Sequence, residues 1–93
     1  MLVVKLIVHG RVQGVGYRQS ILQFVVAKAP DVVGHVMNLA HGGVEIVLSG
    51  PNDQISLVEN FAFEGPELAV VDHIEKLEVY GSENYDEFSI KYI

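Results

Sequence analysis

The sequence GRVQGVGYR, from Gly10 to Arg18, separates two stretches of the chain that differ in hydrophobic period. Before it, residues 2–8 are almost continuously apolar and β-branched, which is typical of a strand covered on both faces. After it, apolar residues recur three or four positions apart from Tyr17 to Ala29, which predicts a helix of about three turns. The glycine-rich segment is therefore expected to connect a strand to the N-terminus of a helix.

The next elements are bounded by clear breaks. Pro30 ends the first helix, because proline disfavours helical geometry in the residue before it. Two strands are expected over residues 32–39 and 44–49, and His41-Gly42-Gly43 between them supplies the flexible residues of a hairpin turn.

The second half of the chain continues in the same manner. Asn52 is the expected N-cap of a second helix, which ends at Gly65-Pro66. Residues 74–80 indicate a strand, and their alternating charges favour the edge of a sheet. A polar loop over residues 81–87 and a last alternating run over residues 88–93 follow.

This order predicts a fold class. Strand, helix, strand, strand, helix, strand and a short extra strand correspond to an α+β, ferredoxin-like split βαβ fold, with two helices on one face of a mixed sheet. We expect residues 1–93 to form a single domain of this class, with the first strand near the sheet centre. Fold class alone does not indicate function, because this arrangement supports many functions.

Composition restricts the partners of the domain. The net charge is −6, and eleven acidic residues stand against the single base Lys76 between Glu45 and Glu87. Such a surface repels nucleic acids and anionic membranes, and no apolar run approaches the roughly 18 residues of a membrane span. The absence of cysteine excludes disulfides, thiolate metal sites and cysteine nucleophiles. We expect a cytoplasmic protein that binds neither nucleic acid nor membrane.

The glycine-rich segment has the composition of an anion-binding loop. Glycines accept positive φ values, so successive backbone N–H groups can point at one spot, and the helix N-terminus adds about half a positive charge. Arg18 in the first helical turn can add a bidentate contact, so phosphate is the expected occupant. The alternative interpretation is an ordinary glycine-rich turn with Arg18 as a surface residue.

Two familiar phosphate loops do not match this segment. A Walker A loop has Lys and then Ser or Thr after its last glycine, whereas Gly16 is followed by Tyr17-Arg18. The dinucleotide pattern G-x-G-x-x-G fails because Gln19 stands at the third glycine position.

Two motifs resemble those of the acylphosphatase family. GRVQGVGYR is similar to that family's first signature, G-x-V-Q-G-V-x-aromatic-Arg. Residues 34–44, GHVMNLAHGGV, with Gly50 beyond them, are similar to the second, G-aromatic-V-x-N-x-x-x-G-x-V-x-x-x-x-x-G. The ending FSIKY at residues 88–92 also resembles the family's usual C-terminus. The resemblance covers the whole chain and implies the same ferredoxin-like fold.

The resemblance also implies roles for particular residues. Arg18 corresponds to the family's phosphate-binding arginine and Asn38 to its water-orienting asparagine, while Arg11 takes a variable position that suggests a solvated loop residue. The implied substrate is a small acyl phosphate, with phosphate or sulfate as an anion ligand and no metal or other cofactor, and we expect a monomer. The backbone expected to bind the phosphoryl group runs through Gln13, Gly14, Val15, Gly16 and Tyr17.

The implied reaction needs few side chains. An acyl phosphate expels a carboxylate whose conjugate acid has a pKa of about 4, so no general acid is required. Charge on the phosphoryl oxygens must be neutralised and a water molecule placed in line with the breaking bond. Arg18 and the loop would do the first, and Asn38 the second.

Three features depart from the family pattern. His35 takes a position that usually holds a large aromatic residue and is expected to loosen the local packing, and Met37 takes a position that is often basic. Arg18 and Asn38 are 20 positions apart, more than expected, and the extra residues should lie around residues 29–31. A second hypothesis therefore stays open: an acylphosphatase-like module that binds anions and turns over little.

Other classes of function have less support. The four histidines, His9, His35, His41 and His73, lack the spacing of metal ligands, and Ser20 has no evident His–Asp relay. An RNA-binding domain of similar topology is disfavoured by the acidic charge and by the lack of an aromatic stacking motif.

Overall fold

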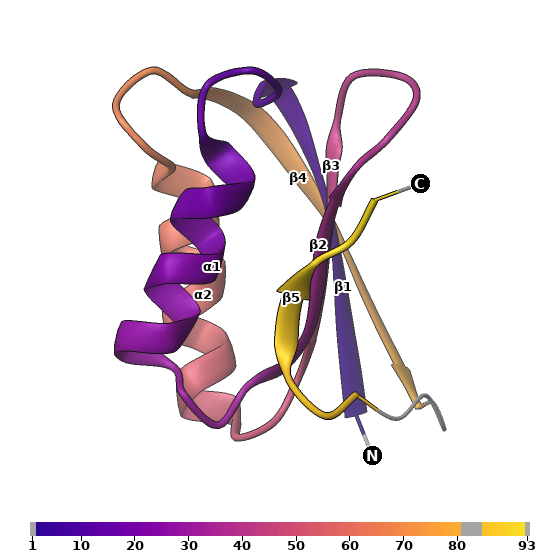
Figure 1. Cartoon of the computed structure of the whole chain (residues 1–93). Coiled ribbons are helices and arrows are strands. Elements are labelled where there is room, and N and C mark those ends of the chain that lie inside the picture. Colours follow the sequence, from indigo (N-terminus) through magenta and orange to yellow (C-terminus); the bar gives the residue numbers. More distant parts are fainter. Residues whose placement is uncertain (1, 81–84, 93) are drawn as a thin grey trace.

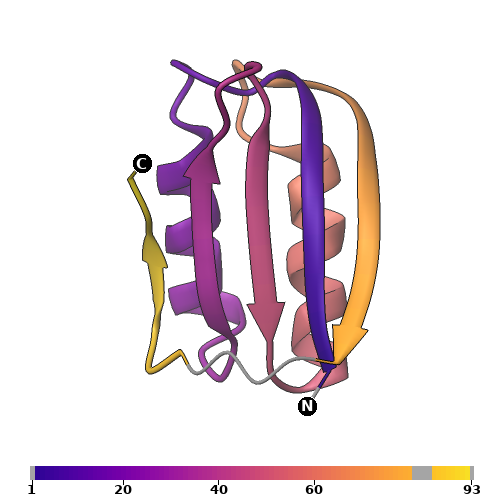
Figure 2. The ribbon, with the colours of Figure 1, turned by 90° about the vertical axis from the view of Figure 1, so that its right-hand side faces the viewer.

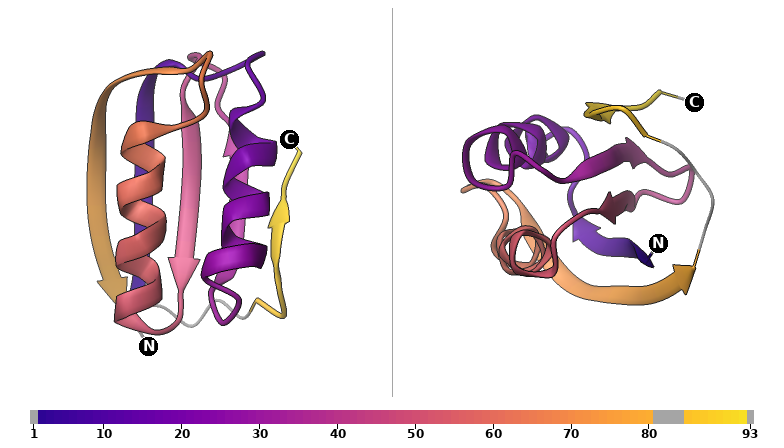
Figure 3. Two further views of the ribbon diagram at one scale, coloured as in Figure 1. Left: turned by 90° about the vertical axis from the view of Figure 1, so that its left-hand side faces the viewer. Right: turned by 90° about the horizontal axis from the view of Figure 1, so that it is seen from below.

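The computed structural model describes residues 2–80 and 85–92. In chain order the elements are β1 (Leu2–Arg11), α1 (Tyr17–Lys28), β2 (Val33–Asn38), β3 (Val44–Ser49), α2 (Asn52–Glu64), β4 (Val70–Tyr80) and β5 (Phe88–Ile90). The two helices lie side by side on one face of the sheet (Figure 1; Figure 3). No helix in these described ranges has the length and apolarity needed to cross a membrane.

The strands form one mixed sheet in the order β4-β1-β3-β2-β5 (Figure 2). β1 pairs antiparallel with both β3 and β4, β2 pairs antiparallel with β3, and β5 runs parallel to β2. The predicted ferredoxin-like fold is therefore confirmed. β1 lies in the interior of the sheet and β4 at its edge, as the apolar and the charged sequences of these strands predict.

Several boundaries differ from those expected. Asn52 is the first helical residue of α2 rather than its N-cap, which is Pro51 in an extended conformation. β4 begins at Val70 instead of residue 74, because its start pairs with the end of β1 beyond a register shift at His9/Gly10. Residues 81–84 of the expected loop and residue 93 of the last run lie outside the described residues.

The core lies between the sheet and the helices. Its largest fully buried side chains include Leu6 and Val8 from β1, Ile46 and Leu48 from β3, and Ile21 from α1. The prediction that both faces of β1 are covered is wrong for the face that carries Lys5 and Ile7. Both residues are only half-buried there, because the two helices pack on the opposite face.

Tyr17 joins the two helices at the end of the molecule where α1 begins. Its side chain is fully buried, and its hydroxyl donates a hydrogen bond of 2.6 Å to the carbonyl oxygen of Ala62. That carbonyl lies in the last turn of α2, and the residue four positions later is Pro66, which has no N–H to donate. Burial raises the pKa of Tyr17 above its usual value, so the hydroxyl remains a donor at neutral pH. Tyr17 thus caps the end of α2.

Replacing Tyr17 by phenylalanine tests this cap. Tyr17→Phe should lower the free energy of unfolding by about 1–3 kcal/mol, because it leaves a buried carbonyl without a donor. Urea denaturation followed by circular dichroism measures the change. Tyr92→Phe removes the hydroxyl of an exposed tyrosine and should leave stability unchanged. Equal stability of the two variants would disprove the capping role.

Candidate functional site

The loop between β1 and α1 leaves a helix N-terminus open. Gly14 and Gly16 have φ values of 75° and 77°, in the left-handed region that glycine accepts most easily. Gly16 is the N-cap of α1, no side chain caps this end, and the first turn has no acidic residue. Within the described chain, no backbone hydrogen bond is donated by the N–H groups of residues 14–19. The positive end of α1 is therefore available to an anion.

Gln13 holds this loop against the β2–β3 connection. Its side-chain Nε2 donates two hydrogen bonds of 2.8 Å, one to the carbonyl oxygen of Leu39 and one to that of Gly43. The loop and the connection lie at the same end of the molecule (Figures 1 and 2). Because Leu39 directly follows Asn38, the last residue of β2, these bonds set the loop beside Asn38.

Arg18 lies between two hollows at this end of the molecule. Its guanidinium carbon is 5.2 Å from the centre of the Tyr92 ring, a cation–π contact. The first hollow, called the loop hollow here, has a volume of about 160 Å³ and is lined by Val12, Gly14, Gly16, Tyr17, Arg18, Gln19, Ile90 and Tyr92. The second, the hairpin hollow, has a volume of about 300 Å³ and is lined by Arg18, Asn38, Leu39, Ala40, Lys91 and Tyr92.

Asn38 lines the hairpin hollow and carries a buried acceptor. Its Oδ1 atom is buried, and within residues 2–80 and 85–92 it has no hydrogen-bond partner. An unsatisfied buried oxygen is unusual in proteins and needs an explanation. A donor from outside the chain, such as a water molecule, would satisfy it.

The structure brings together most of the residues singled out from the sequence. Arg18 and Asn38 line one hollow, and Gly14, Gly16 and Tyr17 line the adjacent one. In the described structure Gln13 and Val15 line neither: the Gln13 side chain bonds to the β2–β3 connection, and Val15 packs against the core. Arg11 is exposed as expected, but it ends β1 instead of lying in the loop.

Sequence reasoning missed the part of the site formed by the end of β5 and the residues after it. Ile90, Lys91 and Tyr92 line the hollows because β5 pairs with β2, and the Lys91 N–H donates to the Val36 carbonyl oxygen at 2.9 Å. The available signal was the FSIKY ending, whose resemblance to the family's C-terminus is positional and says nothing of a site.

His35 does not loosen the packing, contrary to expectation. It is 5% exposed and lies on the face of β2 opposite to Asn38, because residues three apart in a strand point to opposite faces. Its Nε2 donates to Glu45 Oε2 at 2.8 Å, and its Nδ1 is hydrogen-bonded to the Tyr85 hydroxyl at 3.0 Å. Lys5 Nζ approaches the other Glu45 oxygen at 3.0 Å. At the position where the family usually has an aromatic residue, His35 is thus buried with both ring nitrogens hydrogen-bonded.

The longer spacing between Arg18 and Asn38 does not separate them. The connection at residues 29–32 follows the C-terminus of α1, at the opposite end of the helix from Gly16 (Figure 1). Extra residues there leave the loop and the end of β2 in place, so Arg18 and Asn38 still line one hollow.

The other histidines form a stack. The ring centres of His9 and His73 are 4.2 Å apart and those of His9 and His41 are 5.6 Å apart, with His9 Nε2 3.1 Å from Glu75 Oε2. Across the described ranges, no group of three His, Cys, Asp or Glu side chains is placed to hold a metal ion. A role in metal binding therefore has no geometric support.

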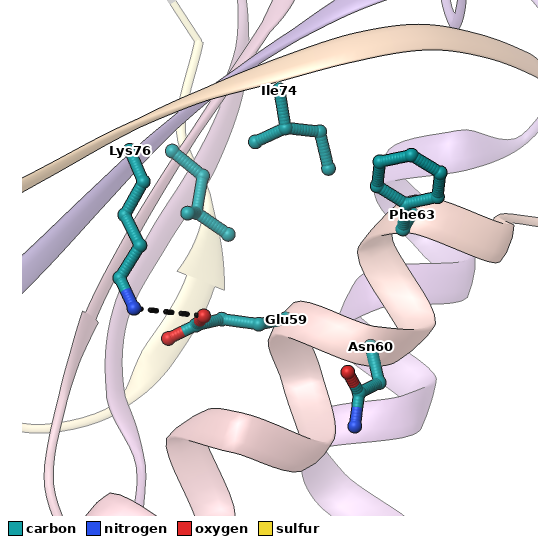
Figure 4. A pocket seen from close by; sticks show the side chains of 6 residues that line it. Glu59, Asn60, Phe63, Ile74 and Lys76 are labelled. Carbon is teal, nitrogen blue, oxygen red and sulfur yellow. Dashed lines mark hydrogen bonds and ion pairs between the residues drawn. The ribbon is translucent and has the colours of Figure 1, made fainter.

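A further hollow of about 480 Å³ lies between α2 and β4 (Figure 4). Leu6, Phe63 and Ile74 contribute its apolar walls, and Lys76 Nζ is paired with Glu59 Oε2 at 3.0 Å. The hydrogen bond with Glu59 raises the pKa of Lys76 above its usual value. The two charged groups satisfy each other, which leaves the hollows beside Arg18 as the better candidate site.

Comparisons with known proteins agree on one family. A family model described as Acylphosphatase matches residues 4–90. An acylphosphatase of Caldivirga maquilingensis is 43% identical over 90 residues, which cover 96% of this chain and 93% of the relative. The crystal structure of acylphosphatase from Bacillus subtilis is similar with a TM-score of 0.90 and 33% identity, over 99% of this chain and 100% of that one. HypF, solved in a phosphate- and nucleotide-bound form, gives a TM-score of 0.78 and 27% identity over 98% of this chain and 12% of its own.

The His35 network predicts a pH-dependent stability. Burial raises the pKa of Glu45, but hydrogen bonds and positive charge from His35 and Lys5 outweigh it, so the pKa lies below its usual value. Ionised Glu45 therefore stabilises the fold above the pKa it has in the unfolded chain, and this contribution disappears as the pH falls through the folded-state pKa.

The stability of Glu45→Gln should accordingly fall below that of the wild type at pH 7, and the difference should shrink between about pH 5 and pH 3. Urea denaturation at several pH values measures both. Glu67→Gln, at an exposed carboxylate with no ion pair within the described residues, should show no such trend. If the difference in free energy of unfolding between the wild type and Glu45→Gln stays constant with pH, ionised Glu45 is not the source of the stabilisation.

Proposed function

The chain belongs to the acylphosphatase family, enzymes that hydrolyse acyl phosphates, and we propose that Arg18 with the β1–α1 loop binds the phosphoryl group while Asn38 positions the attacking water. The observation that supports this most directly is the uncapped positive end of α1 beside Arg18, with Asn38, whose buried Oδ1 lacks a partner in the described structure, lining the adjoining hollow.

The phosphoryl group is bound in the loop hollow. Its oxygens accept hydrogen bonds from the free N–H groups of residues 14–19 and from the guanidinium of Arg18. These donors neutralise charge where it builds up in the transition state, and they are already oriented before the substrate arrives. Phosphate itself fits the same donors, in agreement with the phosphate-bound form of HypF.

The attacking water is held by Asn38. Oδ1 accepts a hydrogen bond from a water molecule and directs the water oxygen towards phosphorus, opposite to the acyl oxygen. An amide is too weak a base to remove a proton from water, so the proton passes to a phosphoryl oxygen. As the bond from the water oxygen to phosphorus forms, the bond from phosphorus to the acyl oxygen breaks. The products are a carboxylate and dihydrogen phosphate.

The departing carboxylate explains why so few groups suffice. Because its conjugate acid has a pKa of about 4, it leaves as an anion at neutral pH and needs no proton. We accordingly propose a reaction that uses neither a general acid nor a metal ion.

Substitution of Arg18 and Asn38 tests the two roles separately. With benzoyl phosphate as substrate, Arg18→Ala should lose at least about 10³-fold in kcat/KM and should no longer bind inorganic phosphate. Asn38→Ala should lose about 10²-fold in kcat and retain its affinity for phosphate. Steady-state kinetics and calorimetric titration with phosphate provide the two readouts.

Arg11→Ala is the matched control, because Arg11 is the only other arginine of the chain and is exposed at the end of β1. It should behave as the wild type in both measurements. An Asn38→Ala variant as active as the wild type would refute the role of Asn38. A wild type that binds phosphate but shows no turnover above background would favour the anion-binding module instead.

A further inference from the structure

Lys91 is a second base that lines the hairpin hollow, besides Arg18. Lys91 lines this hollow together with Asn38, Leu39 and Ala40, and its backbone is fixed to β2 by the hydrogen bond to the Val36 carbonyl. No acidic side chain lines either hollow among the described residues. This matters in a chain whose net charge is −6.

Most other bases of the chain are already compensated or lie elsewhere. Lys5 is paired with Glu45, Lys76 is paired with Glu59, and Lys28 lies in the last turn of α1, where a cation suits the helix dipole. For Lys91 and Arg18, the structure of residues 2–80 and 85–92 contains no carboxylate within ion-pair distance. Arg11 and Lys28 likewise have no carboxylate partner among the described residues, but neither lines a hollow beside the loop. Arg18 and Lys91 are therefore the unpaired bases that border the same hollow.

From this arrangement we infer that Lys91 selects acyl phosphates whose acyl group carries a second anionic group, such as a distal carboxylate. The inference rests on the proposed function, which puts the phosphoryl group in the loop hollow. The acyl group then extends past the shared Arg18 and Tyr92 into the hairpin hollow. A volume of about 300 Å³ suffices for a short acyl chain, and Lys91 is the cation that remains there for its far end.

Lys91 also offers a positive charge at this end of the molecule, where Met37 has none. Met37 takes a position near Asn38 in sequence that is often basic in this family, but its side chain lies on the opposite face of β2 from Asn38. In the segment after β5, Lys91 is the base that lines one hollow together with Asn38. Because Lys91 touches the acyl group and not the reacting phosphorus, its effect is the same in the ground state and in the transition state. It should therefore act on KM and not on kcat.

The test compares succinyl phosphate with butyryl phosphate, which have four-carbon acyl groups with and without a distal carboxylate. The wild type should have the higher kcat/KM for succinyl phosphate, through a lower KM. Lys91→Met should reduce the succinyl-to-butyryl ratio of kcat/KM by about three- to fivefold, the range of a partly exposed ion pair. Lys91→Glu should reverse the preference, and added salt should weaken it in the wild type.

Lys28→Met is the matched control, because it removes the same charge from the opposite end of α1 and should leave the ratio unchanged. An unchanged ratio in Lys91→Met, or an equal loss in Lys28→Met, would overturn the inference. A fall in the ratio caused by kcat alone would also count against it.

A binding experiment separates this inference from the proposed function. If neither acyl phosphate is hydrolysed, the proposed function fails, and 4-phosphonobutyrate and butylphosphonate still report on Lys91 as non-hydrolysable probes. Calorimetric titration should show tighter binding of 4-phosphonobutyrate to the wild type, and Lys91→Met should lose that preference. Equal affinity of the wild type for both probes would disprove a charge-selective hollow.

Discussion

The two hydrogen bonds of the Gln13 side chain are the constraint on which the geometry of the site depends. They join the glycine-rich loop to carbonyl groups 26 and 30 residues later, in the connection that follows Asn38. One amide thereby fixes two loops against each other, and it adds a second donor to two carbonyl oxygens that also accept backbone hydrogen bonds within the β2–β3 connection. Arg18 follows Gln13 by five residues, and Asn38 directly precedes Leu39, the first residue that Gln13 bonds to. The Gln13 side chain therefore positions the two loops, and the role of its backbone in binding the phosphoryl group stays a prediction.

The arrangement also explains how an acidic domain can attract an anion. The attraction is short-ranged, since it comes from the free N–H groups at the start of α1 and from cations that border two small hollows. Acidic residues are absent from the first turn of α1 and, in the described structure, from the lining of both hollows. Elsewhere the negative charge is tolerated because it is screened by salt over about 10 Å.

The sequence predicted those features that depend on local pattern. Element order, the interior position of β1 and the edge position of β4 follow from hydrophobic period and charge, and the motifs located Arg18 and Asn38. The early start of β4 was missed because Val70 and Val71 pair with residues far away in the chain. The N-cap of α2 was assigned to Asn52 on residue preference, which does not decide between adjacent positions. Lys91 was missed because its place depends on the parallel pairing of β5 with β2, which no local pattern indicates.

Strand alternation explains why the departures in β2 leave the site intact. Asn38 faces the helices, whereas His35 and Met37 face the other side of the sheet. The departures from the family pattern at His35 and Met37 therefore alter side-chain contacts on the face away from the site. His35 is accommodated by Glu45, Lys5 and Tyr85, all away from the hollows. Besides Arg18 and Asn38, the residues that line the hairpin hollow come from the β2–β3 connection and from the segment after β5. Loops and chain ends vary more readily than paired strands, so under the proposed function the specificity for the acyl group can change while the phosphoryl site stays constant.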